Sequence, residues 1–128
     1  MKEKIINLTQ HPATPDQKAQ GVVDLPDKLR SELVKQLTFQ EIPSVADLKW
    51  RATLITLIAK SQKATRAMIG GAPYLMSHLE GALMQAGIKP LYAFSLRESR
   101  EEQMPDGSVK KINVFVHKGF VDPYGEEE

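Results

Sequence analysis

The chain reads RAMIGG at residues 66–71, APYLMSHLEGALMQAG at 72–87 and IKPLYAFSLRES at 88–99. The first segment is typical of an apolar strand that runs into Gly70-Gly71. The second has the apolar spacing of a helix that ends at Gly87, and the third is typical of another strand. A strand that passes through a glycine turn directly into a helix brings backbone N–H groups to the carboxyl end of the strand. Because open α/β sheets bind ligands at such junctions, particularly anions, this segment predicts where a ligand binds.

Strands and helices alternate along the rest of the chain. This alternation predicts an α/β protein with a single Rossmann-like three-layer domain over residues 1–121, in which helices cover both faces of a mainly parallel sheet. Residues 38–43 fit either an extended connection or a short strand. We predict strands over residues 4–9, 22–25, 65–69, 91–98 and 109–121, and helices over residues 14–21, 26–37, 44–62 and 73–86.

The last two predicted strands are separated by a strong turn signal. Residues 104–108 read Met-Pro-Asp-Gly-Ser, so the strands on either side should pair as a C-terminal antiparallel β-hairpin. Charged residues dominate its distal part, which we expect to project into solvent. Residues 122–128 are expected to form an acidic flexible tail.

Composition limits the classes of function. With 128 residues and a formal net charge of +1, the chain has no excess of basic residues for binding long nucleic acids. The chain has no cysteine, which excludes disulfides and thiolate metal sites, and no spacing of histidines and carboxylates is typical of a metal site. No apolar run is long enough to span a membrane. We therefore expect a cytoplasmic protein that needs no metal and no cofactor.

The glycine turn is the first candidate for ligand binding. Gly70 and Gly71 could present N–H groups to a phosphate, and Tyr74 could close over a base or ring. The motif is neither a dinucleotide fingerprint nor a Walker sequence. The alternative interpretation is a tight turn between strand and helix in which only glycine fits.

The loop after the first predicted strand is the second candidate. It contains Thr9, Gln10, His11 and Thr14, and in a parallel sheet it lies at the same edge as the glycine turn. His11 could donate a hydrogen bond to a phosphate or act as a general acid or base. The alternative is a surface histidine held rigid by Pro12.

Further polar residues lie on the last strands and on the helix after the glycines. Ser95 and Arg97 alternate on one face of the penultimate strand, where they could contact a sugar, base or phosphate or could simply face solvent. His78 lies next to the apolar stripe of its helix, and His117 lies on the last strand. We expect neither histidine to bind a metal.

The glycine-terminated strand, the following helix and the long hairpin resemble the CRISPR-associated Rossmann-fold (CARF) domains. The opening strand, which runs into the polar turn Asn7-Leu8-Thr9-Gln10-His11-Pro12, resembles them too. The likeness is one of layout over most of the chain, and the chain is one strand–helix unit shorter than the usual CARF core. It implies a homodimer that binds a cyclic oligoadenylate and takes part in antiviral defence.

The main functional hypothesis is therefore a nucleotide-sensing domain that binds an anionic nucleotide, with a cyclic oligoadenylate as one candidate. If the protein also acts on its ligand, we expect metal-independent phosphodiester cleavage, in which the ribose 2′-hydroxyl attacks while the site holds the phosphate. The alternatives are a non-catalytic interaction module and a small metabolic enzyme on the same fold. The apolar helix over residues 45–62 and the long hairpin also predict a homodimer.

Overall fold

Five strands form one mixed sheet in the computed structural model, which describes residues 4–125. β1 (Ile5–Asn7), β2 (Val22–Val23), β3 (Arg66–Met68) and β4 (Lys89–Gln103) pair in parallel in the order β2-β1-β3-β4. β5 (Val109–Val121) pairs antiparallel with β4 at the edge of the sheet. The predicted α/β class, the mostly parallel sheet and the C-terminal hairpin are confirmed.

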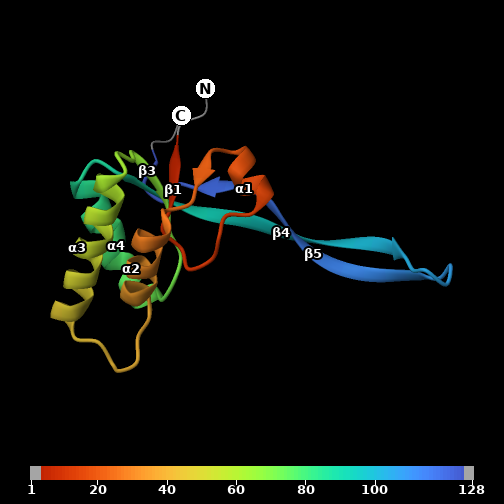
Figure 1. Ribbon diagram of the computed structural model, residues 1–128, viewed down its shortest axis with the longest axis horizontal. Helices are drawn as coiled ribbons and strands as arrows, with labels where there is room; N and C mark the ends of the chain where they lie inside the picture. Colours follow the sequence, from red (N-terminus) through yellow and green to blue (C-terminus); the bar gives the residue numbers. More distant parts are fainter. Residues whose placement is uncertain (1–3, 126–128) are drawn as a thin grey trace.

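Of the four helices within residues 4–125, three form one layer. α2 (Asp27–Leu37), α3 (Val45–Ser61) and α4 (Pro73–Gln85) lie together beside the sheet, and α1 (Pro15–Ala19) lies apart from them (Figure 1). α1 is only five residues long, buries none of its side chains, and contacts β2 and β5. Within residues 4–125, none of the helices combines the length and apolarity that crossing a bilayer requires.

Local signals in the sequence set where two of the helices begin. At α1, the Thr14 hydroxyl accepts a hydrogen bond from the Gln17 N–H, and the Gln17 side chain accepts one from the Thr14 N–H. At α3, the Ser44 hydroxyl accepts from the Asp47 N–H at 3.1 Å. Such caps satisfy N–H groups that have no partner inside the helix, so these boundaries follow the sequence closely.

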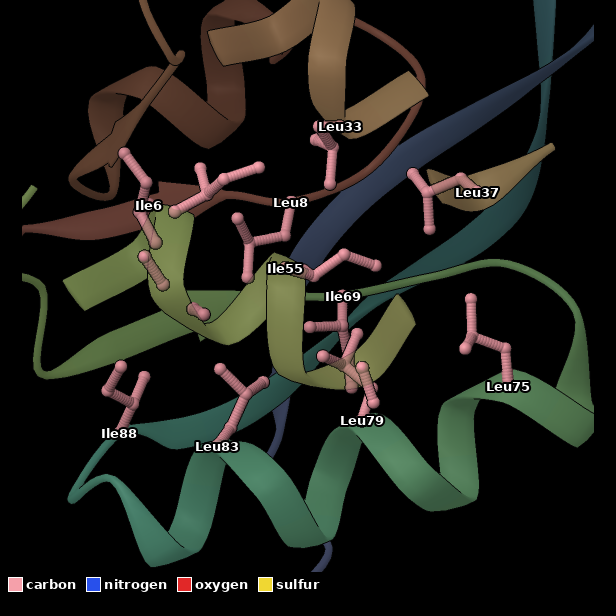
Figure 2. Packing of buried hydrophobic residues seen from close by; sticks show 14 of the residues in the cluster. Ile6, Leu8, Leu33, Leu37, Ile55, Ile69, Leu75, Leu79, Leu83 and Ile88 are labelled. Carbon is pink, nitrogen blue, oxygen red and sulfur yellow. The ribbon is translucent and has the colours of Figure 1, made fainter. Parts of the chain in front are cut away.

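The main hydrophobic core lies between the helical layer and the sheet. Figure 2 shows Ile6 and Ile69, from the region of β1 and β3, packed with side chains of the helices. Leu33 of α2, Ile55 of α3 and Leu79 of α4 are all fully buried there. α2, α3 and α4 each contribute residues at i, i+3 or i+4 spacing, which is the apolar stripe expected from their sequences.

Alternate strand residues face the other side of the sheet. Ile5, Met68 and Leu91 form a smaller buried cluster with Ala13, which precedes α1, and the half-buried Phe120 of β5 packs against it. This cluster is covered by short segments and by the base of the hairpin. The second face of the sheet is therefore thinly covered compared with the first.

The connection between α2 and α3 contains no strand. Residues 38–43 are irregular, which answers the question that the sequence left open. The guanidinium of Arg51 lies 4.2 Å from the ring centroid of Phe39, and its Nη1 donates to the Thr38 carbonyl at 2.7 Å. This connection is therefore held by one side chain of α3 rather than by sheet pairing.

β4 and β5 continue beyond the rest of the sheet as a two-stranded ribbon (Figure 1). β4 extends to Gln103, well past the predicted end at residue 98, because it pairs with β5 along the whole hairpin. The turn closes with a hydrogen bond from the Gly107 N–H to the Met104 carbonyl. Gly107 has a φ of +88°, a conformation that glycine adopts without steric cost.

The start of the expected C-terminal tail is anchored. Asp122 forms an ion pair with Lys89 at 3.2 Å, and the Tyr124 hydroxyl donates to Glu80 Oε1 at 2.7 Å. Residues 122–125 are therefore tied to β4 and α4 by side chains that the acidic composition of the segment did not reveal. Residues 126–128 lie outside the described part of the chain.

Candidate functional site

The order of the strands creates a crevice at the carboxyl ends of β1 and β3. The chain leaves β1 toward β2 on one side, whereas β3 lies on the other side of β1 and leads on to β4. The loops that follow β1 and β3 therefore run in opposite directions. Open α/β sheets bind ligands at such a topological switch point.

A cavity of about 660 Å³ lies at this switch point. Both candidate loops from the sequence contribute to it, as parallel pairing of β1 and β3 predicts. Six of the nine predicted site residues line the cavity: Thr9, Gln10, His11, Thr14, Gly70 and Gly71. The remaining lining residues are Pro12, Gln17, Leu37, Met68, Ile69, Ala72, Tyr92 and Ala93.

The loop after β1 is held by Asn7, the last residue of β1 and 4% exposed. Its amide nitrogen donates to the His11 carbonyl and to Asp24 Oδ1, both at 2.8 Å. Its amide oxygen accepts from the Thr9 N–H at 2.9 Å and from the Thr9 hydroxyl at 2.7 Å. Asn7 therefore fixes the position of Thr9 and His11 at the rim of the cavity.

Asp24 completes this network from the end of β2. Its Oδ1 also accepts from the Ala13 N–H at 2.9 Å. Burial by itself would raise the pKa of Asp24, but the hydrogen bonds from Asn7 and Ala13 and the positive charges of Lys18 and Arg30 outweigh it, so the pKa lies below the ordinary 3.8. Asp24 is therefore ionised at neutral pH and serves as a fixed acceptor for the loop.

The second loop supplies backbone rather than side chains. Ala72 caps α4 without a side-chain hydrogen bond, in contrast to Thr14 at α1 and Ser44 at α3. Gly70 and Gly71 precede it at the cavity wall. The positive end of the α4 dipole is thus available to an anion in the cavity.

Gly70 and Gly71 should differ in how well they tolerate a side chain, which gives a first prediction. Gly71 has a φ of +157°, and an added Cβ would lie 3.4 Å from Met76 Cε, whereas an added Cβ at Gly70 would meet only Thr9 Cγ2 at 3.6 Å. We expect Gly71→Ala to lower the free energy of unfolding by about 1–3 kcal/mol because a residue with a Cβ is strained at this φ. Gly70→Ala should change it by less than about 0.5 kcal/mol. Urea denaturation of both variants tests the difference, and equal stabilities would contradict it.

The remaining walls combine apolar and polar groups. Leu37, Met68 and Ile69 give the cavity an apolar side, and the exposed His11 supplies an imidazole on the polar side. Arg30 Nη2 donates to the Gln10 carbonyl at 3.4 Å, so a positive charge lies beside the loop after β1. Among residues 4–125, no group of three or more histidine, aspartate or glutamate residues is placed to hold a metal ion. The cavity therefore combines apolar side chains with backbone N–H groups and an imidazole that can donate hydrogen bonds.

The structure places the other three predicted site residues away from the cavity. The Tyr74 ring packs edge-on against Phe39, with centroids 5.2 Å apart, and so turns toward the connection between α2 and α3. Ser95 and Arg97 lie on the projecting part of β4, beyond a bulge at Phe94/Ser95, and are exposed there. For Ser95 and Arg97, the structure therefore agrees with the solvent-facing alternative. The position of Tyr74 depends on how the helical layer packs and could not be derived from the sequence.

Tyr92 lines the cavity and was not identified from the sequence. Its hydroxyl donates to the Glu80 carboxylate, which also accepts from Tyr124. Burial, followed by the hydrogen bond and the charge of Glu80, raises the pKa of Tyr92, so the phenol stays protonated at neutral pH. Tyr92 is therefore a fixed wall of the site.

A second hollow of about 760 Å³ lies along the connection between α2 and α3. Of its four charged lining residues (Lys35, Glu41, Asp47 and Arg51), Arg51 and Asp47 are paired with each other at 3.1 Å. Arg51 also donates to the carbonyls at the end of α2. Because these groups hold the connection in place, we assign the candidate site to the smaller cavity at the switch point.

The fold and the cavity together define a small α/β domain with a crevice at its topological switch point. The chain belongs to the Uncharacterized protein MJ1673 family, whose model matches residues 3–121. The matched region contains every strand described above and both loops of the cavity. No curated protein and no solved structure matches the chain.

Proposed function

We propose that the protein is a Rossmann-like domain that binds an anionic nucleotide in the cavity at the switch point. The observation that carries the proposal is the position of the cavity. It lies where the loops after β1 and β3 diverge, beside a helix N-terminus that lacks a side-chain cap. Nucleotides bind at this position in doubly wound sheets because the backbone N–H groups and the helix dipole favour phosphate.

Some lining residues would bind the phosphate of a nucleotide, and others would contact its base. The backbone at Gly70, Gly71 and Ala72 would hold the phosphate, and the His11 side chain would donate a second hydrogen bond to it. The apolar side formed by Leu37 and Met68 would accept the base. The hydrogen bonds from Asn7 to the loop after β1 keep His11 in place without ligand, which lowers the ordering cost of binding.

Within this class of ligand, cyclic oligoadenylate is the candidate that the layout favours. The order of elements resembles that of CARF domains, and in this proposal the protein is a cytoplasmic sensor in antiviral defence. A cyclic oligonucleotide carries several phosphates, so one cavity would hold one part of the ring. Linear adenylates and mononucleotides are therefore the natural comparison ligands.

A ligand screen by thermal shift and calorimetry tests the proposal. We expect a cyclic oligoadenylate or another nucleotide at about 100 times its Kd to raise the Tm by roughly 10 °C, because it binds only the native state. His11→Ala should weaken binding about tenfold or more through the lost charge-assisted hydrogen bond. His78→Ala is the matched control, because His78 lies on α4 and does not line the cavity.

The same screen distinguishes the alternatives. If no nucleotide raises the Tm while a metabolite does, the protein is a metabolic enzyme or sensor of another kind. If no small molecule binds, the cavity is not a ligand site and the interaction-module hypothesis remains. Incubating the ligand with the protein in EDTA, followed by chromatography, shows whether metal-independent cleavage accompanies binding.

A further inference from the structure

The projecting part of β4 has one backbone edge that no strand of the described chain covers. β3 pairs with β4 only at Lys89, Pro90 and Leu91, and β5 occupies the opposite edge as far as Gln103. The outer edge of β4 over residues 93–103 is therefore open, and its side chains are largely exposed. An open edge of this length can pair with another strand through its unpaired N–H and C=O groups.

The charges along this edge are complementary to themselves. Residues 97–101 read Arg-Glu-Ser-Arg-Glu. If the segment pairs antiparallel with a second copy of itself around Ser99, Arg97 lies opposite Glu101 and Glu98 lies opposite Arg100. Opposite charges directly across two strands stabilise the pairing, and like charges disfavour it.

Within the described part of a single copy of the chain, two of the four charged side chains in residues 97–101 form no ion pair. Arg97 and Glu101 share one face of the ribbon, are exposed, and form no ion pair within residues 4–125. On the other face, Glu98 forms ion pairs with Lys118 at 2.9 Å and with Arg100 at 3.8 Å. Within the ribbon, Arg97 lies opposite Phe115, and Glu101 lies opposite Lys111 without forming an ion pair. A second copy would thus place an opposite charge directly across from each of them.

The opposite edge of the ribbon has no such complementarity. β5 carries Lys110, Lys111 and Lys118 and no acidic residue between Val109 and Val121. Lysines on an edge strand protect it from pairing with other strands. Two β5 edges would therefore repel each other, and the β4 edge is the one suited to a second copy.

We propose that two copies of the chain form a symmetric dimer through their β4 edges, with Ser99 on the two-fold axis. The product is a four-stranded antiparallel sheet in the order β5-β4-β4-β5. An isolated two-stranded ribbon is only marginally stable in water, so pairing also stabilises the projecting arm. The dimer is independent of the identity of the ligand in the cavity.

Charge reversal combined with charge exchange tests the dimer. We expect the wild-type chain to be a dimer by light scattering at tens of micromolar. Arg97→Glu places two glutamates opposite each other at both symmetry-related positions, so the dimer Kd should rise about tenfold or more. Arg97→Glu combined with Glu101→Arg restores opposite charges and should restore the dimer. A monomeric wild type, an unaffected Arg97→Glu variant or a double variant that stays monomeric would each overturn the proposal.

Cysteine cross-linking tests the register directly, because the chain contains no cysteine of its own. Ser99→Cys places one thiol opposite its copy at a Cα separation that a disulfide can bridge, so mild oxidation should give a covalent dimer. The matched control is Asn113→Cys, because Asn113 faces Ser99 from β5, with Ser99 Oγ 3.1 Å from Asn113 Oδ1. The Asn113→Cys variant should run as a monomer on gels without reducing agent. Cross-linking at position 113 but not at position 99 would overturn the β4 edge in favour of β5.

Discussion

We expect Asn7→Ala to lower the free energy of unfolding by about 3 kcal/mol and the Tm by roughly 10 °C. The substitution leaves the Thr9 N–H, the His11 carbonyl and the Asp24 carboxylate without the partner that Asn7 provides. These groups lie in a partly buried network, where an unsatisfied donor or acceptor carries its full desolvation cost. Urea denaturation measures the change.

The same variant should also weaken ligand binding, because the loop after β1 loses its anchor. Asn113→Ala is the matched control, since Asn113 lies exposed on the ribbon and its removal should change stability by less than about 0.5 kcal/mol. If Asn7→Ala and Asn113→Ala have the same effect on stability, the network does not hold the loop.

The pH dependence of stability reports on the acidic member of the network. The folded-state pKa of Asp24 is lowered from 3.8, so its contribution to stability is fully present above that value and is lost as the pH falls through the folded pKa. Asp24→Asn cannot titrate. The stability difference between wild type and Asp24→Asn should therefore be constant near neutral pH and shrink as the pH falls below about 4. A difference that grows on acidification would contradict this assignment.

The second large effect is expected at Arg51. Its Nε lies 3.1 Å from both carboxylate oxygens of Asp47, and its Nη1 donates to the carbonyls of Lys35, Gln36 and Thr38. One side chain thus caps the end of α2 and fixes its connection to α3. We expect Arg51→Ala to lower the free energy of unfolding by about 2–3 kcal/mol.

The variant Arg51→Lys separates the effect of charge from that of geometry, and Lys49→Ala is its control. Arg51→Lys keeps the charge but loses the planar fork that reaches several acceptors, so it should retain less than half of the stabilisation. Lys49→Ala removes an exposed cation from the same helix and should change stability by less than about 0.5 kcal/mol. Full stability in the Arg51→Lys variant would show that only the charge matters.

Most of the cavity could be predicted from the sequence because its main elements follow simple rules. The loops that follow parallel strands lie at the same edge of the sheet, so Thr9, His11 and Gly70 were expected at one edge. Asn7 was named only as the start of the polar turn and not as a site residue, although it is a polar residue inside the otherwise apolar segment KIINLT. A polar side chain buried in a strand needs hydrogen-bond partners, and those partners define the network.

The residues that sequence analysis missed or misplaced depend on contacts between distant segments. Tyr92 lines the cavity because β4 pairs with β3, whereas the Tyr74 ring packs edge-on against Phe39. Ser95 and Arg97 were candidates because they alternate on one face of the penultimate strand, with a solvent-facing position as the alternative. The ribbon carries them away from the cavity, since β4 continues beyond the sheet in partnership with β5.

Local patterns in the sequence were enough to predict the α/β class, the starts of α1 and α3 and the turn of the hairpin. Each of these rests on residues within a few positions of one another, such as the Thr14 capping box or the turn at 104–108. The tertiary structure alone decided that β1 lies between β2 and β3, and with it the position of the switch point. It also joined Asn7 to Asp24 and left the charged edge of β4 open. These features depend on which strands become neighbours, and that choice is made by the packing of the whole core rather than by any local stretch of sequence.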